Sequence, residues 1–352
     1  MKKVLIIFLL VIAAFLVLLF YLKNKPVVHA KVKKLNFATV MPANAPWSQA
    51  VAKWIDSINK KGTGKIKINY YPGASLLKHE EMYRGVKEGI ADIVYYSLGD
   101  DQGVLELNSY TTLPFIGYKS WKQATVIYNE LLHSSKFPEL MAEYTDEGII
   151  PYLCRMPPAF QFFNTKRPVR YPKDLKGLKC YTIGNLADTV NKAGGVPVML
   201  QITDVSMSLE RGLIQGVFCH LPAMKIFGFL DRQKYGTVFN EGGAYTPMAC
   251  FLFNAKTWNS LPDDVKKLFT ESEAKLLADL DKIDEGEIND GMKISNKLGI
   301  EYINLKPREL KEWQKLAKPT VDKWIARMEL KGKGAAAKAI WSEVQRQIKV
   351  EK

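Results

Sequence analysis

One strand–helix–strand pattern occurs in two separate parts of this sequence, and it constrains the fold more than any other feature. In the first part, alternating and helical apolar spacings predict strands and helices over 34–40, 46–61, 65–71, 79–88 and 91–96. The second part repeats this order over 177–183, 186–192, 196–200, 204–211 and 217–220. The segments that close the two parts, VKEGIADIV at 86–94 and LERGLIQGV at 209–217, align without a gap. Strands joined by single helices imply right-handed crossovers and mostly parallel sheets, so we expect an α/β chain with two similar lobes.

The remaining segments are predicted to connect these lobes. A buried strand is expected at 248–254, followed by a helix of about thirty residues that ends near Lys297. A helix of this length can reach across both lobes as a brace. Further helices are expected over 306–350, with breaks at Pro319 and at 331–334.

The expected ligand site is a central cleft between the two lobes. Ligands of parallel α/β sheets bind at the carboxyl ends of the strands, and these ends face each other when two lobes meet. We expect lobe I to comprise 31–155 with about 245–285. We expect lobe II to comprise 156–244 with about 286–352, including the C-terminal helices.

The first thirty residues have the pattern of an export segment. Two lysines precede an uncharged apolar run at 4–22, and two more lysines follow it. The run is longer than the usual secretory core of about 7–15 residues and close to the 20 or so that span a bilayer. Residues 1–30 are therefore predicted to be either a signal peptide cut after Ala30 or a membrane anchor. In both cases the body lies in the periplasm, either free or tethered to the inner membrane through residues 4–22.

The positive charge of the chain is dispersed and does not indicate nucleic-acid binding. The 352 residues include 50 Lys and Arg against 36 Asp and Glu, a formal charge of +14. Four of the lysines belong to the export segment, which leaves 46 basic residues and 36 acidic ones in the body. A nucleic-acid-binding protein would show a basic stripe interleaved with aromatic residues, and this sequence has none.

The sequence predicts no catalytic residues, no metal and no cofactor. The segment HEEMY at 79–83 begins like a zinc-protease helix but has Tyr83 where the second histidine ligand is required. The segment at 62–65 lacks the first glycine of a phosphate-binding loop, and no G-x-S-x-G occurs. A triad assembled from distant residues would leave no such motif, but nothing points to one. We therefore expect a protein that is not an enzyme.

Four cysteines lie in apolar segments, at positions 154, 180, 219 and 250. Their first interpretation is as buried thiols that pack like small apolar residues. A disulfide is the alternative in an oxidising compartment, and spacing alone does not give its connectivity.

Six ordered segments over 34–350 resemble the solute-binding subunits of tripartite ATP-independent periplasmic (TRAP) transporters, the DctP family. The most specific is FFNTKRPVRYPKDLKGLK, and the others lie at 35–76, 87–97, 113–121, 208–218 and 252–269. The resemblance implies the two-lobed periplasmic binding protein fold and a monomer without enzymatic activity. It also implies that the protein captures a small molecule in its cleft and passes it to the membrane subunits of a transporter.

The sequence departs from the family at the positions that clamp a substrate carboxylate. Many members of the family carry an arginine two residues after the Gly-Leu-Lys segment, where this chain has Tyr181. A second arginine of some members falls on Phe160, and a common asparagine falls on Cys219. Neither Tyr nor Phe can reproduce the bidentate hydrogen bonds of an arginine to a carboxylate.

Two interpretations of the ligand follow. Another cation, Arg155 or Arg170, binds an organic acid, or aromatic side chains bind an apolar, aromatic or quaternary-ammonium compound. Successive strand residues face opposite ways, so Phe162 and its neighbour Phe163 cannot both face the cleft. The predicted ligand-binding residues are Trp47, Tyr95, Arg155, Phe160, Phe162, Tyr181, Cys219, His220 and Tyr245. The alternative function is a membrane-anchored binding or sensing protein of the same fold that takes no part in uptake.

Overall fold

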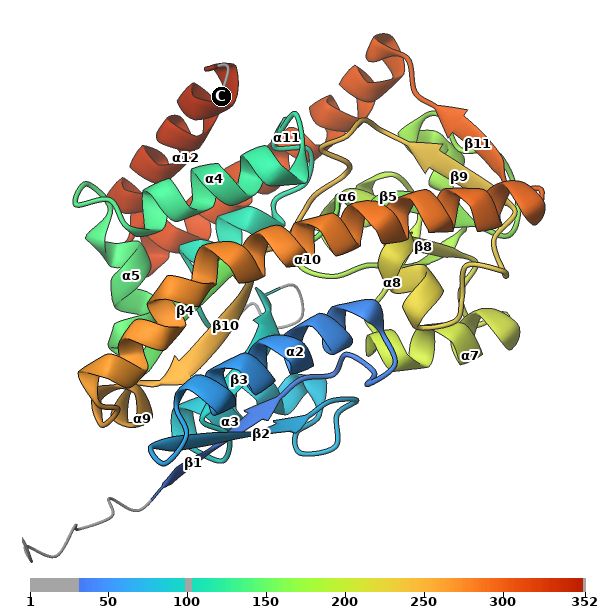
Figure 1. The fold of residues 1–352 in the computed structure, drawn as a ribbon. Coiled ribbons are helices and arrows are strands. Elements are labelled where there is room, and N and C mark those ends of the chain that lie inside the picture. Colours follow the sequence, from blue (N-terminus) through green and yellow to red (C-terminus); the bar gives the residue numbers. More distant parts are fainter. Residues whose placement is uncertain (1–31, 99–102, 351–352) are drawn as a thin grey trace, which may run out of the picture.

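The computed structural model describes residues 32–98 and 103–350, and Figure 1 shows two lobes along which one long helix lies. The predicted export segment at 1–30 lies outside the described residues. Within the described ranges, no helix is both long enough and apolar enough to cross a membrane.

The first lobe is built on a five-stranded sheet in the order β2-β1-β3-β10-β4. Its strands are β1 (Lys33–Ala38), β2 (Ile66–Tyr71), β3 (Ile93–Ser97), β4 (Ile149–Arg155) and β10 (Ala249–Asn254). The first three strands are mutually parallel, as predicted, because α2 (Pro46–Lys61) and α3 (Met82–Glu88) form the crossovers. Strand β10 enters from the far end of the chain and pairs antiparallel with β3 and β4. All of its residues are buried, since helices cover both faces of the sheet.

The second lobe is built on a six-stranded sheet in the order β11-β9-β5-β8-β6-β7. Its strands are β5 (Gln161–Asn164), β6 (Lys179–Tyr181), β7 (Val196–Val198), β8 (Gly216–Cys219), β9 (Tyr235–Val238) and β11 (Glu301–Asn304). Its crossover helices are α6 (Leu186–Lys192) and α7 (Val205–Glu210), and α8 (Leu221–Ile226) follows β8. Strands β6, β7 and β8 repeat the parallel unit of the first lobe, whereas β5 pairs antiparallel with β8 and β9. The sheets are thus more mixed than the sequence predicted, because each lobe takes a central strand from a crossing segment.

Helix α10 (Asp263–Lys297) confirms the long helix predicted from the sequence and lies along both lobes (Figure 1). It begins with Asp263 and Asp264, whose charges favour the helix N-terminus. Its first half buries Phe269 and other apolar residues against the first sheet. In its second half Gly291 lies against Leu221 of α8, where an added Cβ would come within 3.1 Å of that side chain.

The C-terminal helix α11 (Pro307–Leu330) contacts both lobes, and α12 (Gly334–Lys349) packs on the first lobe. Trp313 packs against aromatic residues of the second lobe, while the Trp324 indole lies in the first lobe and donates to the Ser109 Oγ at 3.1 Å. The predicted break at Pro319 was wrong, because α11 continues through this residue. Proline removes one backbone hydrogen bond, but the packing of both tryptophans holds the two halves in one helix. The lobe boundaries drawn from the sequence stay a prediction.

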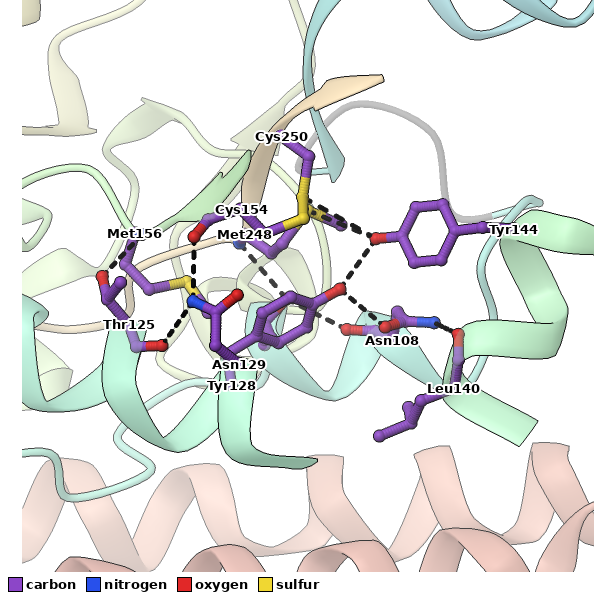
Figure 2. Close-up of a disulfide and its surroundings, with 11 residues drawn as sticks. Asn108, Thr125, Tyr128, Asn129, Leu140, Tyr144, Cys154, Met156, Met248 and Cys250 are labelled. Atoms are coloured by element: carbon purple, nitrogen blue, oxygen red, sulfur yellow. Dashed lines mark hydrogen bonds between the residues drawn. A yellow bond between two sulfur atoms is a disulfide. The ribbon is translucent and has the colours of Figure 1, made fainter. Parts of the chain in front are cut away.

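A disulfide joins Cys154 of β4 to Cys250 of β10, which are register partners in the first sheet (Figure 2). Figure 2 shows the Tyr144 hydroxyl beside the disulfide. This hydroxyl forms a hydrogen bond of 2.7 Å with the Tyr128 hydroxyl. Tyr128 in turn donates to the Asn108 Oδ1 at 2.7 Å. The disulfide alternative therefore holds for this pair. The first interpretation, buried thiols, holds for the other two cysteines, at positions 180 and 219.

Candidate ligand-binding site

A pocket opens where the carboxyl ends of strands from both sheets face each other, and α10 forms its third wall. Its lining is mostly apolar, and its volume is about 110 Å³. An apolar cavity of comparable size, about 150 Å³, is enough to hold benzene. The pocket therefore suits a ligand built on roughly one ring.

The first lobe contributes Trp47, Tyr95 and Arg155 to this pocket. Pro46 starts α2, since its fixed φ suits the first helical position, and the next residue, Trp47, then lies over the end of β3. The Trp47 and Tyr95 rings are 4.5 Å apart between centroids. The Trp47 Nε1 is buried and has no hydrogen-bond partner among residues 32–98 and 103–350.

The second lobe contributes Phe160, Tyr181 and His220. Tyr181 is the last residue of β6, and His220 directly follows β8 as the N-cap of α8. The His220 Nδ1 accepts the backbone N–H of Ala223 at 3.3 Å, which leaves the other ring nitrogen to carry the proton. The imidazole also meets the Phe160 ring edge to face, with 5.1 Å between centroids.

Helix α10 contributes Ile283, Asp284 and Glu287, which the sequence analysis missed. A spacing of three residues puts Asp281, Asp284 and Glu287 on one face of the helix. The sequence signal that could have identified them is the presence of acidic residues on the face of the long helix that is otherwise buried. The side chains of Asp284 and Glu287 are each only 8% exposed, so they form part of the interior.

Arg155 is the cation of this pocket, and its charge is already paired within the protein. Its side chain is 1% exposed, and its guanidinium binds the carboxylate of Asp284 and, at 3.1 Å, that of Asp281. Burial alone would lower the pKa of Arg155, but the carboxylate of Asp284 raises it above its ordinary value, so the guanidinium stays charged. Burial raises the pKa of Asp284 and of Asp281, and the nearby guanidinium only partly opposes this effect.

Six of the nine predicted ligand-binding residues line the pocket, namely Trp47, Tyr95, Arg155, Phe160, Tyr181 and His220. The other three lie outside its lining. Phe162 packs against Phe218 in the second lobe, with 4.7 Å between ring centroids. The Tyr245 ring packs against the Phe160 ring, with 4.6 Å between centroids. Burial raises the pKa of the Cys219 thiol to about 12, so it stays protonated. Their roles in binding stay a prediction.

The second cation considered in the sequence analysis, Arg170, does not line the pocket. Its side chain is 46% exposed, and its guanidinium lies 3.6 Å from the carboxylate of Glu309 in α11. The charges of both candidate arginines are thus paired with protein carboxylates.

His220 predicts a dependence of stability on pH. Burial, together with the charge of Arg155, lowers the pKa of His220 to about 3, against about 6.5 in the unfolded chain. Because the folded pKa is the lower one, the stabilisation is complete above pH 6.5 and is lost as the pH falls towards 3. We expect the free energy of unfolding to drop by roughly 1–3 kcal/mol between pH 7 and pH 4 through this group.

Urea denaturation at the two pH values checks this prediction. His220→Asn, which keeps an oxygen acceptor for the helix cap, should show a smaller drop than the natural protein. The exposed His133 serves as the control, since His133→Asn should keep the full drop. Equal drops in all three proteins would show that His220 does not titrate in this way.

The model of bacterial extracellular solute-binding protein family 7, DctP, matches residues 37–327. The chain belongs to the DctP family. The C4-dicarboxylate-binding protein DctB of Bacillus subtilis is 24% identical over 297 residues, which cover 81% of this chain and 80% of that protein. A solute-binding protein of Chromohalobacter salexigens is 21% identical, and the match spans only 56% of this chain and 57% of that protein.

A solved structure of the same fold carries a bound aromatic acid. It is a marine metagenome TRAP solute-binding protein specific for aromatic acid ligands, in complex with metahydroxyphenylacetate. It superposes with a TM-score of 0.80 at 20% identity and covers 90% of this chain and 98% of that chain. The predicted TRAP resemblance and the two-lobed α/β fold are thus confirmed. The DctP family and its fold are those of extracytoplasmic solute-binding proteins, not those of enzymes.

Proposed function

We propose that this protein captures a small molecule with an aromatic or otherwise apolar body in the cleft between its lobes. It then delivers this molecule, as a monomer in the periplasm, to the membrane subunits of a TRAP transporter. A ligand that touches both lobes and α10 stabilises the closed arrangement selectively, which is the general basis of capture by such a cleft.

The observation that carries this proposal is the aromatic lining of the pocket together with the pairing of Arg155 by protein carboxylates. Both carboxylates contact the Nη2 of Arg155 and balance its charge, so a ligand carboxylate would find no unbalanced positive charge there. Tyr181, at the position where many relatives carry an arginine, is 2% exposed and adds an apolar ring to the lining. The aromatic acid in the metagenome protein shows that this fold can accommodate a ring.

A comparison of 2-phenylethanol with succinate tests the proposal, because the first has a ring without charge and the second has two carboxylates without a ring. We expect 2-phenylethanol to bind in calorimetric titration and succinate to give no signal. Tyr181→Ala should weaken binding of 2-phenylethanol about tenfold or more, whereas Tyr181→Phe, which keeps the ring, should change it by less than threefold. Tight binding of succinate with none of 2-phenylethanol would overturn the proposed ligand class.

Delivery to a transporter is tested separately in cells. Uptake of a ligand identified from the purified protein should be lost when the gene for this chain is deleted and restored when it is returned. Uptake that persists without the chain would argue for a sensing role instead. N-terminal sequencing of soluble and membrane fractions distinguishes a free protein that starts at Lys31 from one tethered through residues 4–22.

A further inference from the structure

The negative charges of the side chains that line the pocket outnumber the positive ones. Apart from the histidines His79 and His220, the described part of the lining contains one cation, Arg155, against two carboxylates, Asp284 and Glu287, a formal charge of −1. Their partners outside the lining are Lys225 and Asp281, and with these included two cations still face three carboxylates. His220 adds no positive charge near neutral pH, because burial keeps its pKa low.

One carboxylate oxygen of Glu287 has no partner in the part of the chain that the structure describes. Its Oε1 accepts a hydrogen bond from the Nζ of Lys225 at 2.9 Å, while its Oε2 is buried and unpaired. Burying a carboxylate oxygen without a hydrogen-bond donor destabilises the folded protein, and the free-energy cost is larger than for an uncharged acceptor. Trp47 and Arg155, which line the pocket from the first lobe, also have buried donors, Trp47 Nε1 and Arg155 Nε, that pair with none of the described residues.

We infer that the ligand carries a protonated amine, and that Glu287 of α10 holds this ammonium group in the pocket. This inference rests on the proposed function and specifies which charged group the ring-bearing ligand carries. An ammonium N–H group supplies the donor that Oε2 lacks and the positive charge that the lining lacks. The rings of Trp47, Tyr95 and Phe160 add favourable contacts to a cation in the same space. A polar oxygen of the ligand then meets the unpaired donors of the first lobe.

A carboxylate would be poorly placed beside α10. It would bring a third negative charge next to Asp284 and Glu287 in an interior with little water to screen it. A quaternary ammonium would satisfy the charge but has no N–H group for the unpaired oxygen of Glu287. The geometry therefore favours a primary or secondary amine over either alternative.

Three probes of one shape test this inference on the purified protein by calorimetric titration at pH 7: 2-phenylethylammonium, 2-phenylethanol and 3-phenylpropionate. We expect 2-phenylethylammonium to bind at least tenfold more tightly than the neutral alcohol, and 3-phenylpropionate to bind more weakly than both. A carboxylate that binds as tightly as the ammonium compound would overturn the inference.

Glu287→Gln removes the charge and keeps the shape of the side chain. It should reduce the affinity for 2-phenylethylammonium at least tenfold while leaving that for 2-phenylethanol within twofold, which also shows that the variant is folded. It should improve binding of 3-phenylpropionate, because it removes one negative charge from the pocket and one of the two carboxylates that pair with Lys225. Glu285→Gln is the matched control on the same helix, since this residue pairs with Lys122 at the surface, and no change is expected. An unchanged affinity of Glu287→Gln for the ammonium probe would overturn the role of Glu287.

The outcomes separate this inference from the proposed function. Failure of all three ring compounds to bind rejects both the aromatic pocket and the ammonium site. Binding of 2-phenylethanol and 3-phenylpropionate without any preference for the ammonium compound rejects the ammonium site alone.

Discussion

Replacing Arg155 with leucine is expected to lower the free energy of unfolding by about 3–5 kcal/mol, as is usual when one partner of a buried ion pair is removed. The guanidinium is 1% exposed and binds Asp284 and Asp281, so its loss leaves two carboxylates near one another inside the protein. Its stacking over the Trp121 ring, 5.6 Å from the ring centroid, is lost as well. Urea denaturation at pH 7 measures this change.

Two further variants distinguish the buried pair from an ordinary surface one. The double variant Arg155→Leu with Asp284→Leu should be more stable than Arg155→Leu alone, because it does not leave the Asp284 carboxylate buried without its arginine. Lys122→Leu breaks the exposed ion pair between Lys122 and Glu285 of α10, and it should lower the free energy of unfolding by at most about 1 kcal/mol. A cost for Arg155→Leu as small as that of Lys122→Leu would contradict the buried pair.

Removal of the disulfide by Cys154→Ala with Cys250→Ala is expected to cost about 2–4 kcal/mol. The two cysteines are 96 positions apart in the sequence, so the disulfide closes a long loop and restricts the unfolded chain strongly. It also joins the edge strand β4 of the first sheet to its neighbour β10, next to the hydroxyl of Tyr144. Denaturation curves of the natural and double-variant proteins give the difference.

Reductant and a second cysteine provide the controls for this experiment. Dithiothreitol should lower the stability of the natural protein towards that of the double variant and leave the double variant unchanged. Cys180→Ala removes a buried free thiol without breaking a covalent link, and we expect it to cost about 1 kcal/mol. If the natural protein is equally stable before and after complete reduction of its disulfide, the stabilising role of the disulfide is contradicted.

Several parts of the candidate site could be predicted because they follow strands whose ends are visible in the sequence. Tyr95, Arg155 and Tyr181 are the residues at or near the ends of β3, β4 and β6, and strand ends of such lobes meet at the cleft. Phe162 shows the limit of this reasoning, since alternation allows one face or the other and only the packing against Phe218 decides. The continuation of α11 through Pro319 likewise depends on contacts that no local pattern contains.

The sequence alone was enough to predict the two α/β units and the long helix. It could do so because periodicity and motif spacing are local properties of the chain. The tertiary structure alone decided that Cys154 pairs with Cys250 and that Arg155 is neutralised by Asp284, a residue 129 positions later. Such pairs depend on where β10 enters the sheet and how α10 lies across both lobes. The charge balance of the cleft is therefore a property of the folded protein, because it arises from residues that only the fold brings together.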